Sequence, residues 1–149
     1  MTASQRPLPL CIRTIQDLRA QVQDWRRTDQ RIALVPTMGA LHQGHLSLVR
    51  LASQHADRVI VSIFVNPTQF APHEDFTSYP RTFDTDMALL SHEQADVVYA
   101  PRPEQIYPQG FDLSIMIGGP AKADLEDRFR PHFFHGVATV VAKLLTQSA

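Results

Sequence analysis

Residues 31–45 read RIALVPTMGALHQGH, and this stretch decides the fold class of the chain. Its beginning, residues 31–36, is a short apolar run that predicts a buried strand. The residues that follow include Gly39 and Gly44, which predict a loop leading into a helix over residues 46–56. A buried strand followed by a glycine-bearing loop and a helix is the repeating unit of α/β proteins.

The alternation of strands and helices continues on both sides of this stretch. It predicts an α/β fold with a Rossmann-like parallel sheet flanked by helices, in which ligands bind at the carboxyl ends of the strands. Residues 1–11 carry two prolines and are expected to be loose. Helices are predicted over 14–28, 84–94 and 137–145, helical turns near 104 and over 123–129, and strands over 58–65, 96–100 and 113–117.

Length and composition exclude several classes of protein. The 149 residues suit one domain, and 44% hydrophobic against 19% charged residues favours a packed core over disorder. A net charge of -1 and a pI near 6.6 argue against a broad nucleic-acid surface. No apolar run has the length of a membrane span, and the single Cys11 excludes an internal disulfide. We expect a cytoplasmic protein with neither nucleic-acid nor membrane partners.

The first candidate functional group is the histidine pair His42 and His45, three residues apart at the predicted start of a helix. The free N–H groups and the dipole of a helix N-terminus favour a phosphate. Two imidazoles placed there could hold charge as it moves onto a leaving pyrophosphate. The alternative is two surface histidines that cap a helix.

The second candidate group follows the apolar strand over residues 58–65. Asn66 and the proline after it would turn the chain out of the strand and aim Gln69 at the crevice beyond the sheet. The alternative is a turn asparagine and a solvated glutamine. Phe64 and Met38 would supply an apolar wall, or they would be plain core residues.

Charged residues near the predicted helix over 84–94 form the third group. Asp86 is a candidate ligand for Mg²⁺, which commonly uses one or two carboxylates together with substrate phosphates. Alternatively, Asp86 and Asp84 are first-turn acids favoured by the helix dipole. Arg81 would meet phosphate or pair with a nearby acid such as Glu74 or Asp75.

Several stretches, in order, resemble the pantoate–β-alanine ligase family. Residues 35–45 resemble its nucleotide-binding stretch, and the His-x-Gly-His element resembles the signature of the wider nucleotidylyl-transferase superfamily. The resemblance runs from about residue 12 to about residue 146 and implies the HIGH-type nucleotidylyl-transferase fold. The further matching stretches are VSIFVNPTQF (61–70), YPRT (79–82), IYP (106–108) and GVATVVAKL (136–144).

The resemblance implies a reaction in which pantoate and ATP give pantoyl adenylate and pyrophosphate, and β-alanine then gives pantothenate and AMP. It implies catalytic roles for His45, at the family's proton-donor position, and for His42. Gln69 matches a glutamine that contacts pantoate and β-alanine, and we assign pantoate contacts also to Met38, Phe64 and Asn66. The ATP-binding residues would be Pro36, Thr37, Met38, Gly39, Ala40, Leu41, His42, Gln43, Gly44 and His45.

The chain departs from the family in two respects. Residues 130–136 read RPHFFHG, where the family usually carries Arg-Pro-Gly-His-Phe, so an imidazole is displaced by one place. The chain is also about half as long as family members. We therefore expect an N-terminal nucleotide- and pantoate-binding domain without the family's C-terminal domain, with little or no activity alone. Lys143 is expected to be a solvated residue of the last helix.

Two other functions compete with this interpretation. In the first alternative, the chain is a non-catalytic module for nucleotide binding or for dimerisation. The resemblance implies dimerisation because the family typically forms homodimers through this domain. Less favoured is a metal-binding protein that uses the imidazoles of His42, His45, His132 and His135.

Overall fold

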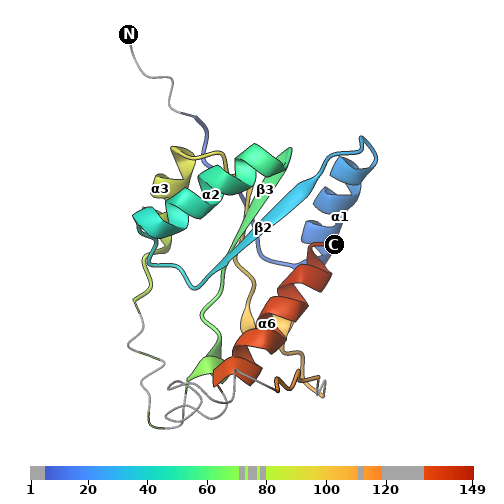
Figure 1. Cartoon of the computed structure of the whole chain (residues 1–149), viewed down its shortest axis with the longest axis vertical. Helices are drawn as coiled ribbons and strands as arrows, with labels where there is room; N and C mark the ends of the chain where they lie inside the picture. Colours follow the sequence, from blue (N-terminus) through green and yellow to red (C-terminus); the bar gives the residue numbers. More distant parts are fainter. Residues whose placement is uncertain (1–5, 71–72, 74–76, 78–79, 111–112, 119–132) are drawn as a thin grey trace.

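The computed structural model describes residues 6–70, 73, 77, 80–110, 113–118 and 133–149. Its centre is a four-stranded sheet in the order β1-β4-β3-β2, with every neighbouring pair parallel. Figure 1 shows β2 and β3 side by side. The strands are β1 (Leu10–Ile12), β2 (Ile32–Thr37), β3 (Arg58–Ile63) and β4 (Val97–Tyr99). The helices are α1 (Ile15–Arg26), α2 (Gln43–His55), η1 (Pro67–Gln69), α3 (Phe83–Ser91), α4 (Pro103–Ile106) and α6 (Phe133–Gln147).

Helices cover both faces of the sheet, which confirms the predicted α/β fold. Successive residues of a strand point to opposite faces, so Ile60 of β3 packs beneath α1 and α6 while Val59 and Val61 pack beneath α2 and α3. In β4, Val97 packs on the face covered by α1 and α6, and Val98 packs on the face covered by α2 and α3. None of the helices in the described part of the chain has the length and apolar character needed to span a bilayer.

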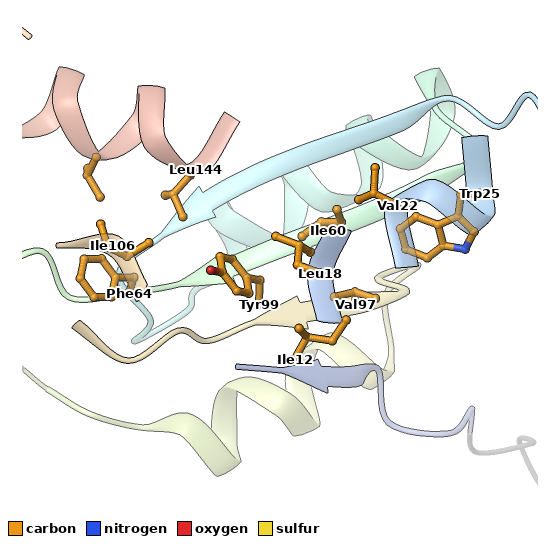
Figure 2. Packing of buried hydrophobic residues seen from close by; sticks show 11 residues of the cluster. Ile12, Leu18, Val22, Trp25, Ile60, Phe64, Val97, Tyr99, Ile106 and Leu144 are labelled. Carbon is orange, nitrogen blue, oxygen red and sulfur yellow. The ribbon is translucent and has the colours of Figure 1, made fainter. Parts of the chain in front are cut away.

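The core under α1 explains why the predicted helix forms. Leu18, Val22 and Trp25 recur at helical spacing and bury one stripe of the helix against β3 and β4 (Figure 2). The predicted cap is confirmed, because the Thr14 hydroxyl oxygen accepts a hydrogen bond from the Asp17 N–H at 3.1 Å.

The expectation that residues 1–11 are loose is wrong at its end, where Leu10–Ile12 form β1. The Leu10 N–H donates to the Asp96 carbonyl at 3.0 Å, and the Ala100 N–H donates to the Ile12 carbonyl at 2.8 Å. This edge strand of three residues is too short to show a period of its own, and pairing with β4 defines it.

The predicted strand over residues 113–117 is also wrong, since none of the described residues 113–118 is in a strand. The Ile115 N–H donates to the Thr139 hydroxyl at 2.8 Å, and His135 Nε2 lies 3.3 Å from the Ile117 carbonyl. These backbone groups are satisfied by side chains of α6, so the segment follows that helix instead of joining the sheet. The helical turn predicted over 123–129 lies outside the described residues.

Lys143 of α6 is buried, which corrects the expectation of a solvated residue. Its ammonium donates to the Ile106 carbonyl at 2.9 Å and lies 5.1 Å from the centre of the Tyr107 ring. A buried cation needs such partners, and these link α6 to the end of α4.

Candidate functional site

A cavity of about 450 Å³ lies at the carboxyl edge of the sheet. Because all four strands are parallel, the segments that leave them meet at this edge. A second hollow lies at the opposite edge, near Pro7, Asp57 and Asp96, away from the motifs singled out in the sequence. The carboxyl-edge cavity is lined by Arg13, Met38, Gly39, Ile63, Phe64, Val65, Pro80, Arg81, Thr82, Phe83, Asp86, Ala100, Pro101 and Pro103.

The turn between β2 and α2 forms one wall of the site and has an unusual backbone. Gly39 and Ala40 both have positive φ, 77° and 50°, in the left-handed region that alanine rarely adopts. The Thr37 hydroxyl donates to the Ser62 carbonyl at 2.8 Å and accepts from the Gly39 N–H at 3.1 Å. Thr37 therefore ties the start of the turn to β3.

His42 and His45 lie against each other at the start of α2, with ring centres 4.1 Å apart. His42 caps the helix: its Nδ1 accepts from the Gly44 N–H at 3.0 Å, and His45 Nδ1 accepts from the His42 N–H at 3.2 Å. A neutral ring whose Nδ1 accepts must carry its proton on Nε2. The two rings therefore offer two Nε2–H donors beside a helix N-terminus.

The surroundings of His45 favour its neutral form. Burial lowers the pKa of His45 below 6.5, the nearby His42 lowers it further, and the negative charge of Asp86 acts in the opposite direction. A neutral imidazole with an Nε2–H group still donates a hydrogen bond to a phosphate oxygen.

A buried amide holds the segment that leaves β3. Asn66 Oδ1 accepts from the Tyr107 hydroxyl at 2.6 Å and the Thr68 hydroxyl at 2.9 Å, while its Nδ2 donates to the Gly136 carbonyl at 3.1 Å. Asn66 is fully buried and thus joins η1, α6 and the end of α4. Gln69, half-buried at the end of η1, depends on this junction for its position.

The sequence and the fold match a known family. The model of the pantoate-beta-alanine ligase family matches residues 10–149. The chain belongs to this family. A pantothenate synthetase of Rhodopseudomonas palustris is 60% identical over 139 residues, which are 93% of this chain and 49% of the relative. Pantothenate synthetase 2 of Bradyrhizobium diazoefficiens is 61% identical over the same shares.

Solved structures of the family share the fold. Pantothenate synthetase from Thermus thermophilus has a TM-score of 0.86 and 42% identity, over 93% of this chain and 49% of that one. The Francisella tularensis ligase, complexed with beta-gamma ATP and beta-alanine, has a TM-score of 0.87 and 39% identity. The match covers 94% of this chain and 53% of that one. This chain thus spans about half the length of the curated relatives it matches.

The structure brings several of the predicted residues together. Met38, Gly39, Phe64 and Asp86 all line the cavity. Phe64 is also 6% exposed and part of the core, so it is both wall and core residue. The predicted contact between Asn66 and pantoate does not suit a fully buried amide, and we assign Asn66 to positioning instead.

Other predicted residues lie differently from the simplest expectation. Gln69 is not among the residues that line the cavity. The side chain of Leu41 packs in the core beneath α2, and that of Thr37 is buried in hydrogen bonds, so either would reach a nucleotide only through its backbone. Arg81 Nη1 donates to the Thr77 carbonyl at 3.1 Å, and its predicted acidic partners lie outside the described residues.

The sequence analysis missed two polar residues of the site. Arg13 lines the cavity because it directly follows β1, the strand that was not predicted. The apolar residues before the Thr14 helix cap are the signal that would have revealed it. Tyr107 bonds Asn66 from the loop after α4, and no local pattern indicates that contact.

The described residues do not form a prepared metal site. Among them, no three His, Cys, Asp or Glu side chains are grouped to hold a metal ion. Of the four histidines considered for a metal, His132 lies outside the described residues. Asp86 does not fit as a magnesium ligand, because it is 1% exposed and its two oxygens accept backbone N–H groups of Ala40 and Leu41.

The histidine geometry predicts a specific tautomer and titration. Both His42 and His45 should show protonated Nε2 and unprotonated Nδ1 in long-range ¹H–¹⁵N spectra at pH 7.5. The His45 titration midpoint should lie below 6.5, because burial disfavours the imidazolium. His45 binds fewer protons folded than unfolded in this range, so its contribution to stability falls as pH drops below 6.5. A midpoint above 6.5, or a protonated Nδ1, would contradict the arrangement.

The contact between α6 and η1 predicts the effect of adding one methyl group. A Cβ at Gly136 would lie 2.6 Å from the Thr68 carbonyl oxygen, which is backbone and cannot swing away. We expect Gly136→Ala to lower the free energy of unfolding, because overpacking costs about 1–3 kcal/mol and the gain in helix propensity is about 1 kcal/mol. Urea unfolding would measure this.

Gly118→Ala is the matched control for that variant. A Cβ at Gly118 would meet no atom of the described residues within 4 Å, so its effect on the free energy of unfolding should stay within about 0.5 kcal/mol. Equal stability of the two variants would show that α6 and η1 are not in the close contact described.

Proposed function

We propose that this chain forms the ATP and pantoate site of an ATP-dependent ligase that condenses pantoate with β-alanine. The observation that carries the proposal is the pair of Nε2–H donors of His42 and His45 at a helix N-terminus. This helix follows the turn whose Met38 and Gly39 line the cavity. Membership of the family supports the choice of substrates.

In the first step, an oxygen of the pantoate carboxylate attacks the α-phosphorus of ATP. A new P–O bond forms, the bond between the α-phosphorus and the bridging oxygen breaks, and pyrophosphate leaves. A carboxylate is already ionised near neutral pH, so this step needs no general base. The site must align the reactants and stabilise phosphate charge, which suits the Nε2–H groups of His42 and His45 and the N-terminus of α2.

In the second step, the amine of β-alanine attacks the acyl carbon of pantoyl adenylate. The new C–N bond replaces the C–O bond to phosphate, AMP leaves and the nitrogen loses a proton. In this proposal Met38 and Phe64 pack against the methyl groups of pantoate, and the Gln69 amide hydrogen-bonds pantoate and β-alanine. Magnesium is proposed to accompany ATP, and we assign no described residue to hold it.

One other function is favoured by a specific observation. The His42 and His45 donors at the start of α2 would serve nucleotide binding without turnover equally well, because holding a phosphate needs no bond to break. We also propose that the chain forms a homodimer and resides in the cytoplasm, in keeping with its family and with the unpaired Cys11.

Calorimetric titration with Mg-ATP, with and without pantoate, tests the proposal. We expect ATP to bind with a stoichiometry near one and to bind more tightly when pantoate is present, because the two share one cavity. Release of pyrophosphate on addition of pantoate separates a catalytic chain from a binding module. A folded chain that binds no ATP in either condition would contradict the proposed site.

Histidine variants locate the binding within the chain. His42→Ala and His45→Ala should each weaken ATP binding about tenfold or more, since each removes a hydrogen bond to a charged group worth roughly 1.5–3 kcal/mol. His55→Ala is the matched control, because His55 is exposed in the last turn of the same helix. ATP affinity that is equal in all three variants would place the nucleotide elsewhere.

A further inference from the structure

Asp86 makes an unusual contact for an acid in the first turns of a helix. Its side chain is 1% exposed, and its two oxygens divide between two successive backbone donors. Oδ2 accepts from the Ala40 N–H at 3.0 Å, and Oδ1 accepts from the Leu41 N–H at 2.8 Å. The Thr82 hydroxyl donates to Oδ2 at 3.3 Å and orients the carboxylate. One side chain of α3 thus binds the turn between β2 and α2.

The turn has no other means of satisfying these groups among the contacts described. Ala40 adopts the left-handed region, φ 50°, which costs energy for a residue with a Cβ. Its N–H and that of Leu41 point into the protein, where an unpaired donor is unfavourable. Space is also limited, since a Cβ at Gly39 would lie 3.1 Å from Asp86 Oδ2. The carboxylate therefore satisfies both donors in a conformation that the local sequence does not favour.

We propose that Asp86 is a positioning residue: it holds the turn at residues 39–41 in the conformation that places His42 and His45 toward phosphate. This inference rests on the proposed function, because it assigns the work of Asp86 to the ATP site. The turn ends directly at His42, whose backbone N–H binds His45 Nδ1 at 3.2 Å. Displacement of the turn would move both rings.

The assignment has two electrostatic consequences. Asp86 occupies the N–H groups of Ala40 and Leu41, so an anion at this site must bind to other donors, namely the histidine rings and the start of α2. Its negative charge also faces His45 and raises the pKa of that ring, against the effects of burial and of His42. Asp86 thus affects both the protonation of the His45 ring and the position of that ring.

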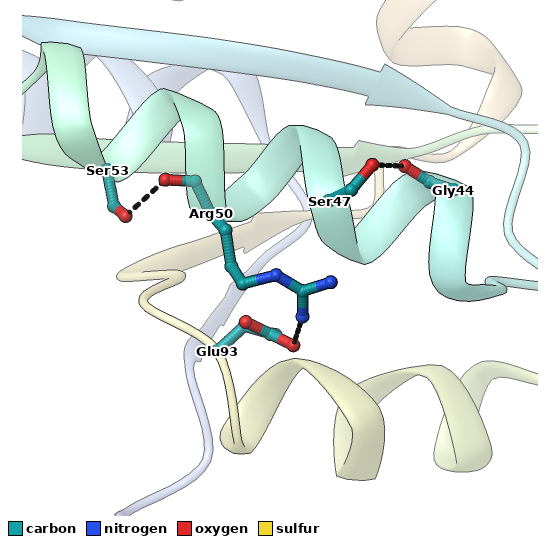
Figure 3. Close-up of polar contacts among 5 residues, drawn as sticks. All are labelled: Gly44, Ser47, Arg50, Ser53 and Glu93. Atoms are coloured by element: carbon teal, nitrogen blue, oxygen red, sulfur yellow. Dashed lines mark hydrogen bonds and ion pairs between the residues drawn. The ribbon is translucent and has the colours of Figure 1, made fainter.

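Further contacts between α2 and α3 hold α3 in place, and so fix the position of Asp86. Arg50 of α2 forms an ion pair with Glu93, just after α3 (Figure 3). Met87 and Leu90 of α3 pack in the same core cluster as Val49 of α2. Asp86 therefore acts from a helix that is already fixed against α2.

Asp86→Asn tests the inference with nearly unchanged shape. An amide has one oxygen and one NH₂ group, so it cannot accept from both Ala40 and Leu41. We expect the Kd for ATP to rise about tenfold or more and the pKa of His45 to fall, because the opposing negative charge is lost. Asp84→Asn, an exposed acid in the same helical turn, should leave both values unchanged.

Wild-type affinity and an unchanged His45 pKa in Asp86→Asn would overturn the inference. A merely structural role would lower the free energy of unfolding but leave the Kd for ATP of the folded variant unchanged, and that result would also overturn it.

Amide hydrogen exchange of the unmodified chain gives an independent test should the variant fail to fold. The Ala40 and Leu41 N–H groups should exchange slowly although they lie in a turn, and rapid exchange of both would overturn the inference. If the wild-type chain binds no ATP but shows slow exchange, the proposed function fails and the contact of Asp86 with the turn stands.

Discussion

The two hydrogen bonds from the Ala40 and Leu41 backbone to Asp86 are the constraint on which the site depends. They fix a turn with two successive positive φ angles, and that turn delivers His42 to the position where it caps α2. The cap then orients His45. A buried carboxylate is an expensive group, and here its cost is offset by donors on a different segment of the chain.

The parallel sheet explains why the other groups gather at the same place. All four strands end at one edge, so Arg13, Met38 and Phe64 come from different strand exits and line one cavity. Asn66 and Asp86 play comparable parts at two of these loops. The buried Asn66 amide fixes the loop that follows β3, and the buried Asp86 carboxylate fixes the loop that follows β2. The site is thus a set of loops held by internal hydrogen bonds on a rigid sheet.

The sequence predicted the elements whose signal is local. Strands near 31–36 and 58–65 are continuous apolar runs, and the capped helix after Thr14 has a clear period. The strand predicted over 31–36 runs one residue past Pro36, to Thr37. A proline is tolerated there because β2 is an edge strand of the described sheet, where a missing N–H can face outward.

The features that were missed depend on partners distant in the sequence. The strand at Leu10–Ile12 is defined by β4, nearly ninety residues away. The burial of Lys143 requires the Ile106 carbonyl, and the role of Asp86 requires a turn 45 residues earlier. A single sequence shows which residues have reactive or polar side chains. It does not show which of these side chains already form hydrogen bonds to distant parts of the protein.

The most direct test of the account is an NMR titration of the ¹⁵N-labelled chain with Mg-ATP, read residue by residue. The account predicts that shift changes concentrate at residues 38–45 and around Phe64, at the carboxyl edge of the sheet. Changes centred on Asp57 and Asp96 at the opposite edge would contradict it, as would the absence of changes at saturating ATP.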